Sequence, residues 1–278
     1  MIKLKSTGLV GEWDRTSEEY FMIGHYDGGI SLLKESNLEQ VHEYKGHSVP
    51  IRNIAISPDN RHFYSAGHRE NHFLQWEVST AKVTRRIKTP SEVTIIQANK
   101  CFVLTGHADG TIRLWDHRLN TPLQQLAEAS DAISGVQLSR EGFFSSSLDG
   151  GLRQYGVKDG RVVEDVVGDG VEQMIVSEDM RLALVRLVDG EQRRVGLVDT
   201  ESGKELKSFG AATCISWLDY KLQDQFIYGS EDGELAKTDL VSGRKTLVQD
   251  NLSVSHLKCS RVRNKVIVLT MDGYLRIV

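Results

Sequence analysis

Acidic residues recur along this chain at a spacing of about forty residues, and carboxylates are side chains that can hold metal ions or act as general acids and bases. Six of them precede a glycine in a common phase, with a first interval of 82 residues followed by intervals of 40, 40, 43 and 40. A glutamate falls near the middle of the long interval. The seven positions are Asp27, Glu70, Asp109, Asp149, Asp189, Asp232 and Asp272. Because Asp-Gly suits a tight hairpin turn, we interpret all seven as structural turn residues and not as catalytic groups or metal ligands.

Three histidines precede the first three turn positions by two residues, which raises the question of a shared metal ion. They are His25, His68 and His107. One ion needs ligand nitrogens within about 2.1 Å, and equivalent turns of successive repeats are too far apart for that. We therefore expect a structural role or a contact with a partner, and no metal site.

Between the turns, the chain alternates short apolar runs with Gly, Asn and Asp. The second repeat shows the pattern, with strand-like runs at 51–57, 62–66, 72–76 and 82–87. Four antiparallel strands in each repeat of about forty residues indicate a propeller. The sequence thus predicts an all-β fold, a seven-bladed β-propeller that forms a single domain over residues 1–278. The last repeat stops at its third strand, so we expect the N-terminal strand, residues 1–5, to close the last blade.

Catalytic motifs are missing from the sequence, which contains no HExxH, GxSxG, GxxxxGK[ST] or GxGxxG pattern. Enzymes built on propellers tend to gather carboxylates on the innermost strands around the channel. The strands expected there carry only Glu12 and Glu172, in the first and fifth repeats. The sequence therefore predicts a protein that is not an enzyme, with no catalytic residue, no cofactor and no small-molecule substrate.

The chain most strongly resembles a WD repeat at residues 104–116, which read LTGHADGTIRLWD. All seven units are similar to WD-repeat propellers. The resemblance implies that each well-formed repeat holds a buried, hydrogen-bonded set of His, Ser or Thr, Asp and Trp. The second unit has His47, Glu70 and Trp76, but Ala66 stands at the expected hydroxyl position. The third unit lacks a Gly-His pair before its first strand, so no unit shows the full set.

A narrower likeness extends over several units. It covers residues 44–47 with 59–60 and Trp76, then 126–139 leading to 147–155, 199–206, and 230–233 with 239–243. Together these segments resemble the mitogen-activated protein kinase organizer family, whose members are seven-bladed scaffolds similar to propellers found in spliceosomes. The resemblance implies binding of kinase-cascade components or a place in an mRNA-processing complex.

Composition restricts where such a protein works. The chain has 278 residues, with 34 Lys plus Arg against 38 Asp plus Glu, and a net charge of −4 argues against coating of duplex nucleic acid. Apolar runs are far shorter than the ~20 residues of a membrane span, and the first residues lack the apolar stretch of a secretory signal. Three cysteines form no CxxC pair. We expect an intracellular protein, cytoplasmic or nuclear, without membrane contact.

Two basic segments, residues 82–88 and 258–265, are candidates for an RNA contact. Neither has the interleaved aromatic residues that stack on bases. The first falls on an expected outermost strand, where charge protects an exposed edge. We interpret both segments as solvated surface.

Residues beside the turn acids vary between repeats, as expected for a surface that binds a partner while the framework repeats. Aromatic and Arg side chains are favoured anchors of interfaces. The predicted partner surface consists of Tyr26, His68, Arg69, His107, Glu231 and Met271. A longer loop at residues 188–194 is a further recognition candidate. The leading hypothesis is a non-enzymatic scaffold that joins proteins in a multiprotein complex. The alternative is a reader of peptides or modified residues, such as a ubiquitin-ligase substrate receptor.

Overall fold

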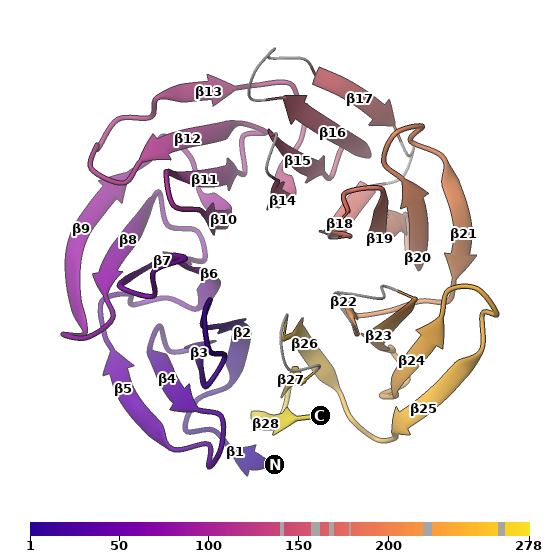
Figure 1. The fold of residues 1–278 in the computed structure, drawn as a ribbon, viewed down its shortest axis with the longest axis horizontal. Helices are drawn as coiled ribbons and strands as arrows, with labels where there is room; N and C mark the ends of the chain where they lie inside the picture. The colour runs from indigo at the N-terminus through magenta and orange to yellow at the C-terminus, as the bar shows by residue number, and fades with distance from the viewer. Residues whose placement is uncertain (140–141, 157–161, 167–169, 178, 219–223, 261–264) are drawn as a thin grey trace.

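The computed structural model describes residues 1–139, 142–156, 162–166, 170–177, 179–218, 224–260 and 265–278. The regular secondary structure of these residues consists of β-strands alone. The strands form seven antiparallel sheets of four strands each, set around a ring (Figure 1). The fold is a seven-bladed β-propeller, which confirms the prediction.

The blades are numbered one to seven by their innermost strands. These innermost strands are β2 (Gly8–Trp13), β6 (Ile51–Ile56), β10 (Val93–Ala98), β14 (Ile133–Leu138), β18 (Gly170–Val176), β22 (Cys214–Trp217) and β26 (Val254–Cys259). The second strands are β3 (Tyr20–His25), β7 (His62–Gly67), β11 (Phe102–His107), β15 (Gly142–Ser147), β19 (Leu182–Asp189), β23 (Gln225–Gly229) and β27 (Val266–Thr270). The third strands are β4 (Ile30–Lys34), β8 (His72–Glu77), β12 (Ile112–Asp116), β16 (Gly151–Gly156), β20 (Gln192–Asp199), β24 (Leu235–Asp239) and β28 (Tyr274–Ile277). The outermost strands are β5 (Gln40–Tyr44), β9 (Lys82–Lys88), β13 (Gln124–Leu126), β17 (Val162–Val166), β21 (Glu205–Phe209), β25 (Lys245–Gln249) and β1 (Ile2–Lys3).

Burial falls from the second strand of a blade to its outermost strand. Every residue of β15 and β27 is buried, because both faces of these strands are covered by neighbouring blades. The outermost strand β9 is mostly exposed and carries four basic residues, a charge pattern that protects a sheet edge from pairing with another chain. The first basic segment therefore lies where the sequence predicted. Residues 261–264 of the second segment lie outside the described residues.

The two ends of the chain meet in blade seven. Strand β1 pairs with β28 through Ile2↔Leu275 and Lys3↔Tyr274, and the Leu4 N–H donates to the Gly273 carbonyl at 2.9 Å. The side chain of Ile2 packs against a buried cluster that contains Leu275. The N-terminal strand thus completes the last blade, as predicted.

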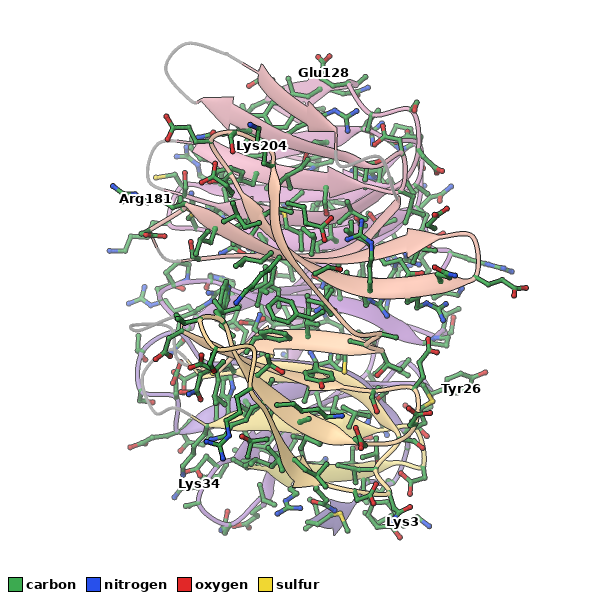
Figure 2. The ribbon with its side chains drawn as sticks, turned by 90° about the vertical axis from the view of Figure 1, so that its right-hand side faces the viewer. Lys3, Tyr26, Lys34, Glu128, Arg181 and Lys204 are labelled. Atoms are coloured by element: carbon green, nitrogen blue, oxygen red, sulfur yellow. The ribbon has the colours of Figure 1, made fainter. Side chains whose placement is uncertain are left out.

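The ring has two faces that carry different turns. Turns between second and third strands lie on what we call the upper face, which includes Tyr26 (Figure 2). Turns between first and second strands, and between third and fourth strands, lie on the opposite or lower face. Figure 2 shows Arg181, Lys34 and Lys204 on that lower face.

Blade five departs from the predicted longer loop at residues 188–194. Strands β19 and β20 stay paired as far as Asp189↔Gln192, so that only Gly190 and Glu191 form the turn. The additional residues therefore lengthen a hairpin and not a loop, and a role of this hairpin in recognition stays a prediction. Arg193, in this hairpin, forms ion pairs with Glu172 at 3.6 Å and with Glu231 of blade six at 3.1 Å.

Candidate functional site

Blade two contains a complete polar network beneath its upper turn. The Trp76 indole N–H donates to Ser65 Oγ at 2.7 Å, and the Ser65 hydroxyl lies 2.7 Å from His47 Nε2. The other ring nitrogen of His47 lies 2.5 Å from a carboxylate oxygen of Glu70. Burial lowers the pKa of His47, against the opposing effect of Glu70. A neutral ring that accepts from Ser65 and donates to Glu70 satisfies all four groups.

This network corrects the sequence interpretation, which placed Ala66 at the hydroxyl position. The reason is one additional residue in the turn of blade two. Strand β7 ends at Gly67, which pairs with Ile51, whereas in blade three His107 pairs with Val93 in the same register. Counting four residues back from Glu70 therefore gives Ala66, one residue beyond Ser65, which holds the hydroxyl position. Arg69 fits this longer turn by adopting a left-handed conformation with φ of +58°.

The same register shift separates the three histidines that the sequence grouped together. His25 and His107 are the last residues of their strands, and both are buried. His68 lies beyond the strand, in the turn, and its side chain is half exposed. His25 lies 2.8 Å from Ser31 Oγ, so it belongs to the interior of blade one. Only His68 of the three presents its ring at the upper surface.

His107 supplies the histidine that blade three lacks before its first strand. Trp115 donates its indole N–H to Thr105 Oγ1 at 2.8 Å, and the same oxygen lies 2.8 Å from His107 Nε2. His107 has 0% exposure, and burial lowers its pKa to about 4. A side chain with no exposed surface cannot contact a partner. His107 is therefore removed from the predicted partner surface.

Three of the seven turn acids accept hydrogen bonds from backbone N–H groups of their own turns. Asp27 accepts the Gly29 N–H at 3.0 Å, Asp109 the Thr111 N–H at 3.1 Å, and Asp149 the Gly151 N–H at 2.8 Å. The glycine that follows the acid adopts a positive φ in the six Asp-Gly turns: Gly28, Gly110, Gly150, Gly190, Gly233 and Gly273. Burial opposes ionisation of Asp149, but hydrogen bonds from Arg153 and backbone N–H groups outweigh it and lower the pKa. These are the contacts that a structural turn residue would make.

One group of side chains in the described residues has the composition of a metal site, namely His47, Glu70 and His72. His72 Nε2 lies 3.4 Å from the Glu70 carboxylate, and its ring stacks on His47 with centroids 5.9 Å apart. Both ring nitrogens of His47 are already used by Ser65 and Glu70. A metal would have to displace one of these hydrogen bonds and disrupt the network of blade two. The cluster is better suited to a polar network than to a metal.

Charged groups on the innermost strands are matched by partners of opposite charge. Glu12 pairs with Lys258 at 2.7 Å and with Arg15 at 3.8 Å. Glu172 pairs with Arg186 at 3.0 Å. Arg52, the only arginine that the sequence placed on these strands, contacts Glu92 at 3.1 Å. The pairs Glu12–Lys258 and Arg52–Glu92 join neighbouring blades, whereas Glu172–Arg186 lies within blade five. Because Arg52 is already paired, the basic pocket that would favour a reader of modified residues is not built around it.

The remaining predicted partner residues lie in upper turns of four consecutive blades. Glu231 belongs to blade six, Met271 to blade seven, Tyr26 to blade one, and His68 with Arg69 to blade two. Tyr26, Met271 and His68 occupy equivalent places, since each donates its N–H to a carbonyl in the connection that precedes its own blade. Tyr26 is 65% exposed and Met271 62% exposed. We call this set of five residues the upper arc.

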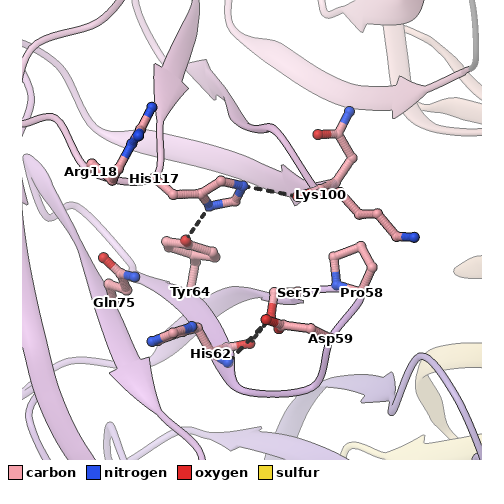
Figure 3. A pocket seen from close by; sticks show the side chains of 10 residues that line it. Ser57, Pro58, Asp59, His62, Tyr64, Gln75, Lys100, His117 and Arg118 are labelled. Carbon is pink, nitrogen blue, oxygen red and sulfur yellow. Dashed lines mark hydrogen bonds between the residues drawn. The ribbon is translucent and has the colours of Figure 1, made fainter.

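Sequence reasoning missed a pocket on the lower face between blades two and three. Its volume is about 640 Å³, and Tyr64, Gln75 and His117 are among its lining residues (Figure 3). The turn of residues 57–62 and the connection after β12 form its rim. These segments belong to different repeats, so no local motif marks the pocket.

Comparison with known proteins supports a WD-repeat propeller. The family model "WD domain, G-beta repeat" matches residues 38–76 and 83–116. A WD repeat-containing protein of Schizosaccharomyces pombe is 28% identical over 165 residues, which cover 56% of this chain and 54% of that protein. WD repeat domain-containing protein 83 of Rattus norvegicus is 31% identical over 134 residues, covering 45% of this chain and 40% of the relative. Autophagy-related protein 16 of Arabidopsis thaliana is 25% identical over 253 residues, covering 85% and 48%. The chain thus spans about half the length of these relatives.

Across the described part of the chain, no helix has the length and apolar character needed to cross a membrane.

Proposed function

We propose that this WD-repeat propeller is a non-enzymatic scaffold that binds other proteins through its upper face. The upper arc carries the proposal. It places two large apolar side chains, Tyr26 and Met271, in water on adjacent blades, next to the basic Arg69. Large exposed apolar side chains are favoured anchors of interfaces, because a partner that covers them removes their apolar surface from water.

The charges of the upper arc favour a partner with a mixed surface. Arg69 at one end has no ion-pair partner within the described residues, while Glu231 at the other end is bound to Arg193. An apolar centre between charged ends matches the anatomy of protein interfaces, in which a buried apolar core is surrounded by a polar rim.

Two finer assignments belong to this proposal. The resemblance to the mitogen-activated protein kinase organizer family supports a scaffold for kinase-cascade components, and the likeness to spliceosomal propellers supports an mRNA-processing complex. Both assignments place the protein in the cytoplasm or the nucleus. They are distinguished by which proteins the scaffold retains from cells.

Affinity purification from source cells tests the scaffold directly. The double variant Tyr26→Ala plus Arg69→Glu is compared with a matched pair on the lower face, Val241→Ala plus Arg181→Glu. Val241 is 84% exposed, so its truncation removes a similar apolar contact from the opposite face. We expect the upper-face variant to lose partners that the lower-face variant retains. Full retention of every partner by the upper-face variant would overturn the proposal.

A further inference from the structure

Three of the four prolines in the chain directly follow a hydroxyl residue. The three dipeptides are Ser57-Pro58, Thr89-Pro90 and Thr121-Pro122. Proline-directed protein kinases phosphorylate a Ser or Thr in this position, and they bind the residues on both sides of it in an extended conformation. A substrate site therefore needs an exposed hydroxyl that can approach the γ-phosphate, and a backbone that is not hydrogen-bonded to the rest of the fold.

Two of the three hydroxyl groups are buried and already hydrogen-bonded. Ser57 is 6% exposed, and both its hydroxyl and its N–H donate to the His62 carbonyl, at 2.8 Å and 3.0 Å. Thr89 is 8% exposed, its hydroxyl donates to the Ser91 carbonyl at 2.8 Å, and its N–H donates to the Asn71 carbonyl at 2.9 Å. Phosphorylation of either residue would require the loss of these hydrogen bonds and local unfolding.

Thr121 differs from the other two in both exposure and hydrogen bonding. It lies in the connection between β12 and β13 on the lower face, where residues 118–125 are all exposed. Its hydroxyl forms no hydrogen bond with any described residue, and the same is true of the backbone groups of residues 120–122. Of the three dipeptides, the fold thus leaves Thr121-Pro122 accessible to an enzyme.

The surroundings of Thr121 suit a negative charge. The Arg85 guanidinium, on β9 of blade two, donates to the side-chain oxygen of Asn120, which is neutral. Arg85 forms no ion pair with any described residue. The nearby carboxylate of Asp116 is paired with Arg118 at 2.8 Å. A phosphate on Thr121 would add a charge of about −1.5 to −2 at pH 7 one residue from the Asn120 side chain that this uncompensated guanidinium contacts.

We propose that Thr121 is a phosphorylation site for a proline-directed protein kinase. The Thr121 hydroxyl oxygen forms a bond to the γ-phosphorus of kinase-bound ATP, and the bond between that phosphorus and the oxygen shared with the β-phosphate breaks. The hydroxyl proton passes to the catalytic aspartate of the kinase, and ADP leaves. The site lies on the face opposite the upper arc, so it does not depend on the proposed scaffold surface. Leu119 and Leu123 are 44% and 51% exposed, so the modification changes the charge of a segment that also presents apolar side chains.

Phosphorylation in vitro tests the site. A panel of purified proline-directed kinases is first assayed with MgATP on a synthetic peptide of residues 115–127 and on peptides of the same length centred on Ser57 and Thr89. Each kinase that modifies a peptide is then applied to the whole folded protein, and the modified residue is identified by mass spectrometry. We expect the folded protein to carry phosphate at Thr121, with at least tenfold less at Ser57 and Thr89, because the fold protects these two residues.

Three variants separate the assignment from a general effect on the protein. Thr121→Ala and Pro122→Ala should each lower phosphate incorporation at least tenfold, whereas Thr121→Ser should retain it. Both positions are exposed, so the melting temperature of each variant should match that of the original protein, which excludes a loss of fold. Phosphate that prefers Ser57 or Thr89 in the folded protein, incorporation that persists in Pro122→Ala, or no kinase that modifies Thr121 of the folded protein would overturn the proposal.

Discussion

Acidification should weaken the fold through His107, the buried histidine of blade three. The ring has 0% exposure, and its pKa falls from an ordinary 6.5 to about 4 because burial disfavours the charged form. Between pH 6.5 and about 4, the His107 ring is protonated in the unfolded chain and neutral in the folded chain. The free energy of unfolding therefore decreases as the pH falls from 6.5 toward 4, and it is unaffected by this group above pH 7.

The magnitude follows from the pKa difference. One pKa unit corresponds to about 1.4 kcal/mol, so His107 should remove about 3 kcal/mol of stability once the pH is below 4 and about 2 kcal/mol at pH 5. Other buried histidines add to the total effect. A variant at the same position isolates this contribution, because the remaining histidines are common to both proteins.

His107→Ser is a suitable variant, since serine occupies the same register in blade four, where Ser147 pairs with Ile133. Urea unfolding of both proteins at pH 8, 7, 6 and 5 gives the difference in free energy of unfolding. That difference should be nearly constant between pH 8 and 7, even if the substitution itself costs stability. It should then shift by about 2 kcal/mol in favour of the variant by pH 5. A difference that stays constant down to pH 5 would refute the reasoning.

Three further predictions concern stability. Ser65→Ala should cost about 1–3 kcal/mol because it leaves the buried Trp76 indole N–H without an acceptor. Ser145→Ala in blade four should cost far less, since Ser145 Oγ is buried without a hydrogen-bond partner among the described residues, and equal losses in urea unfolding would contradict this. Deleting residues 2–6 removes the strand that closes blade seven, so the melting temperature should fall, and an unchanged melting temperature would argue against closure by this strand. Asp109→Ala should cost about 1–3 kcal/mol and spare partner binding at permissive temperature, and lost binding at full stability would reverse its structural interpretation.

Local patterns in the sequence were sufficient to predict the ring. Asp-Gly turns depend on the conformations of two adjacent residues, and strands of alternating burial depend on short-range periodicity. Both are encoded within each repeat of about forty residues. Counting repeats and strand-like runs along the sequence was therefore enough to predict the number of blades, the four strands in each and the closure by residues 1–5. The same repetition indicated that the turn acids are structural.

Which side chains hydrogen-bond to each other within a blade could be determined only from the tertiary structure. One additional residue in the turn after Gly67 shifted the count, so the hydroxyl of blade two was assigned to Ala66 and not to Ser65. His107 was expected at the surface, yet strand pairing turns it inward to Thr105. Register decides which side chains meet, and a shift of one residue moves a strand residue to the opposite face.

The pocket on the lower face shows this division most clearly. The sequence by itself determined that seven similar units form a ring, because each unit carries its own turns and strands. It did not indicate that Gln75 Oε1 is buried without a hydrogen-bond partner among the described residues. Nor did it indicate that Tyr64 lies beside His117, which is 53 residues away along the chain. That site exists only where two blades pack together, and the packing of one blade against the next is what the tertiary structure alone decides.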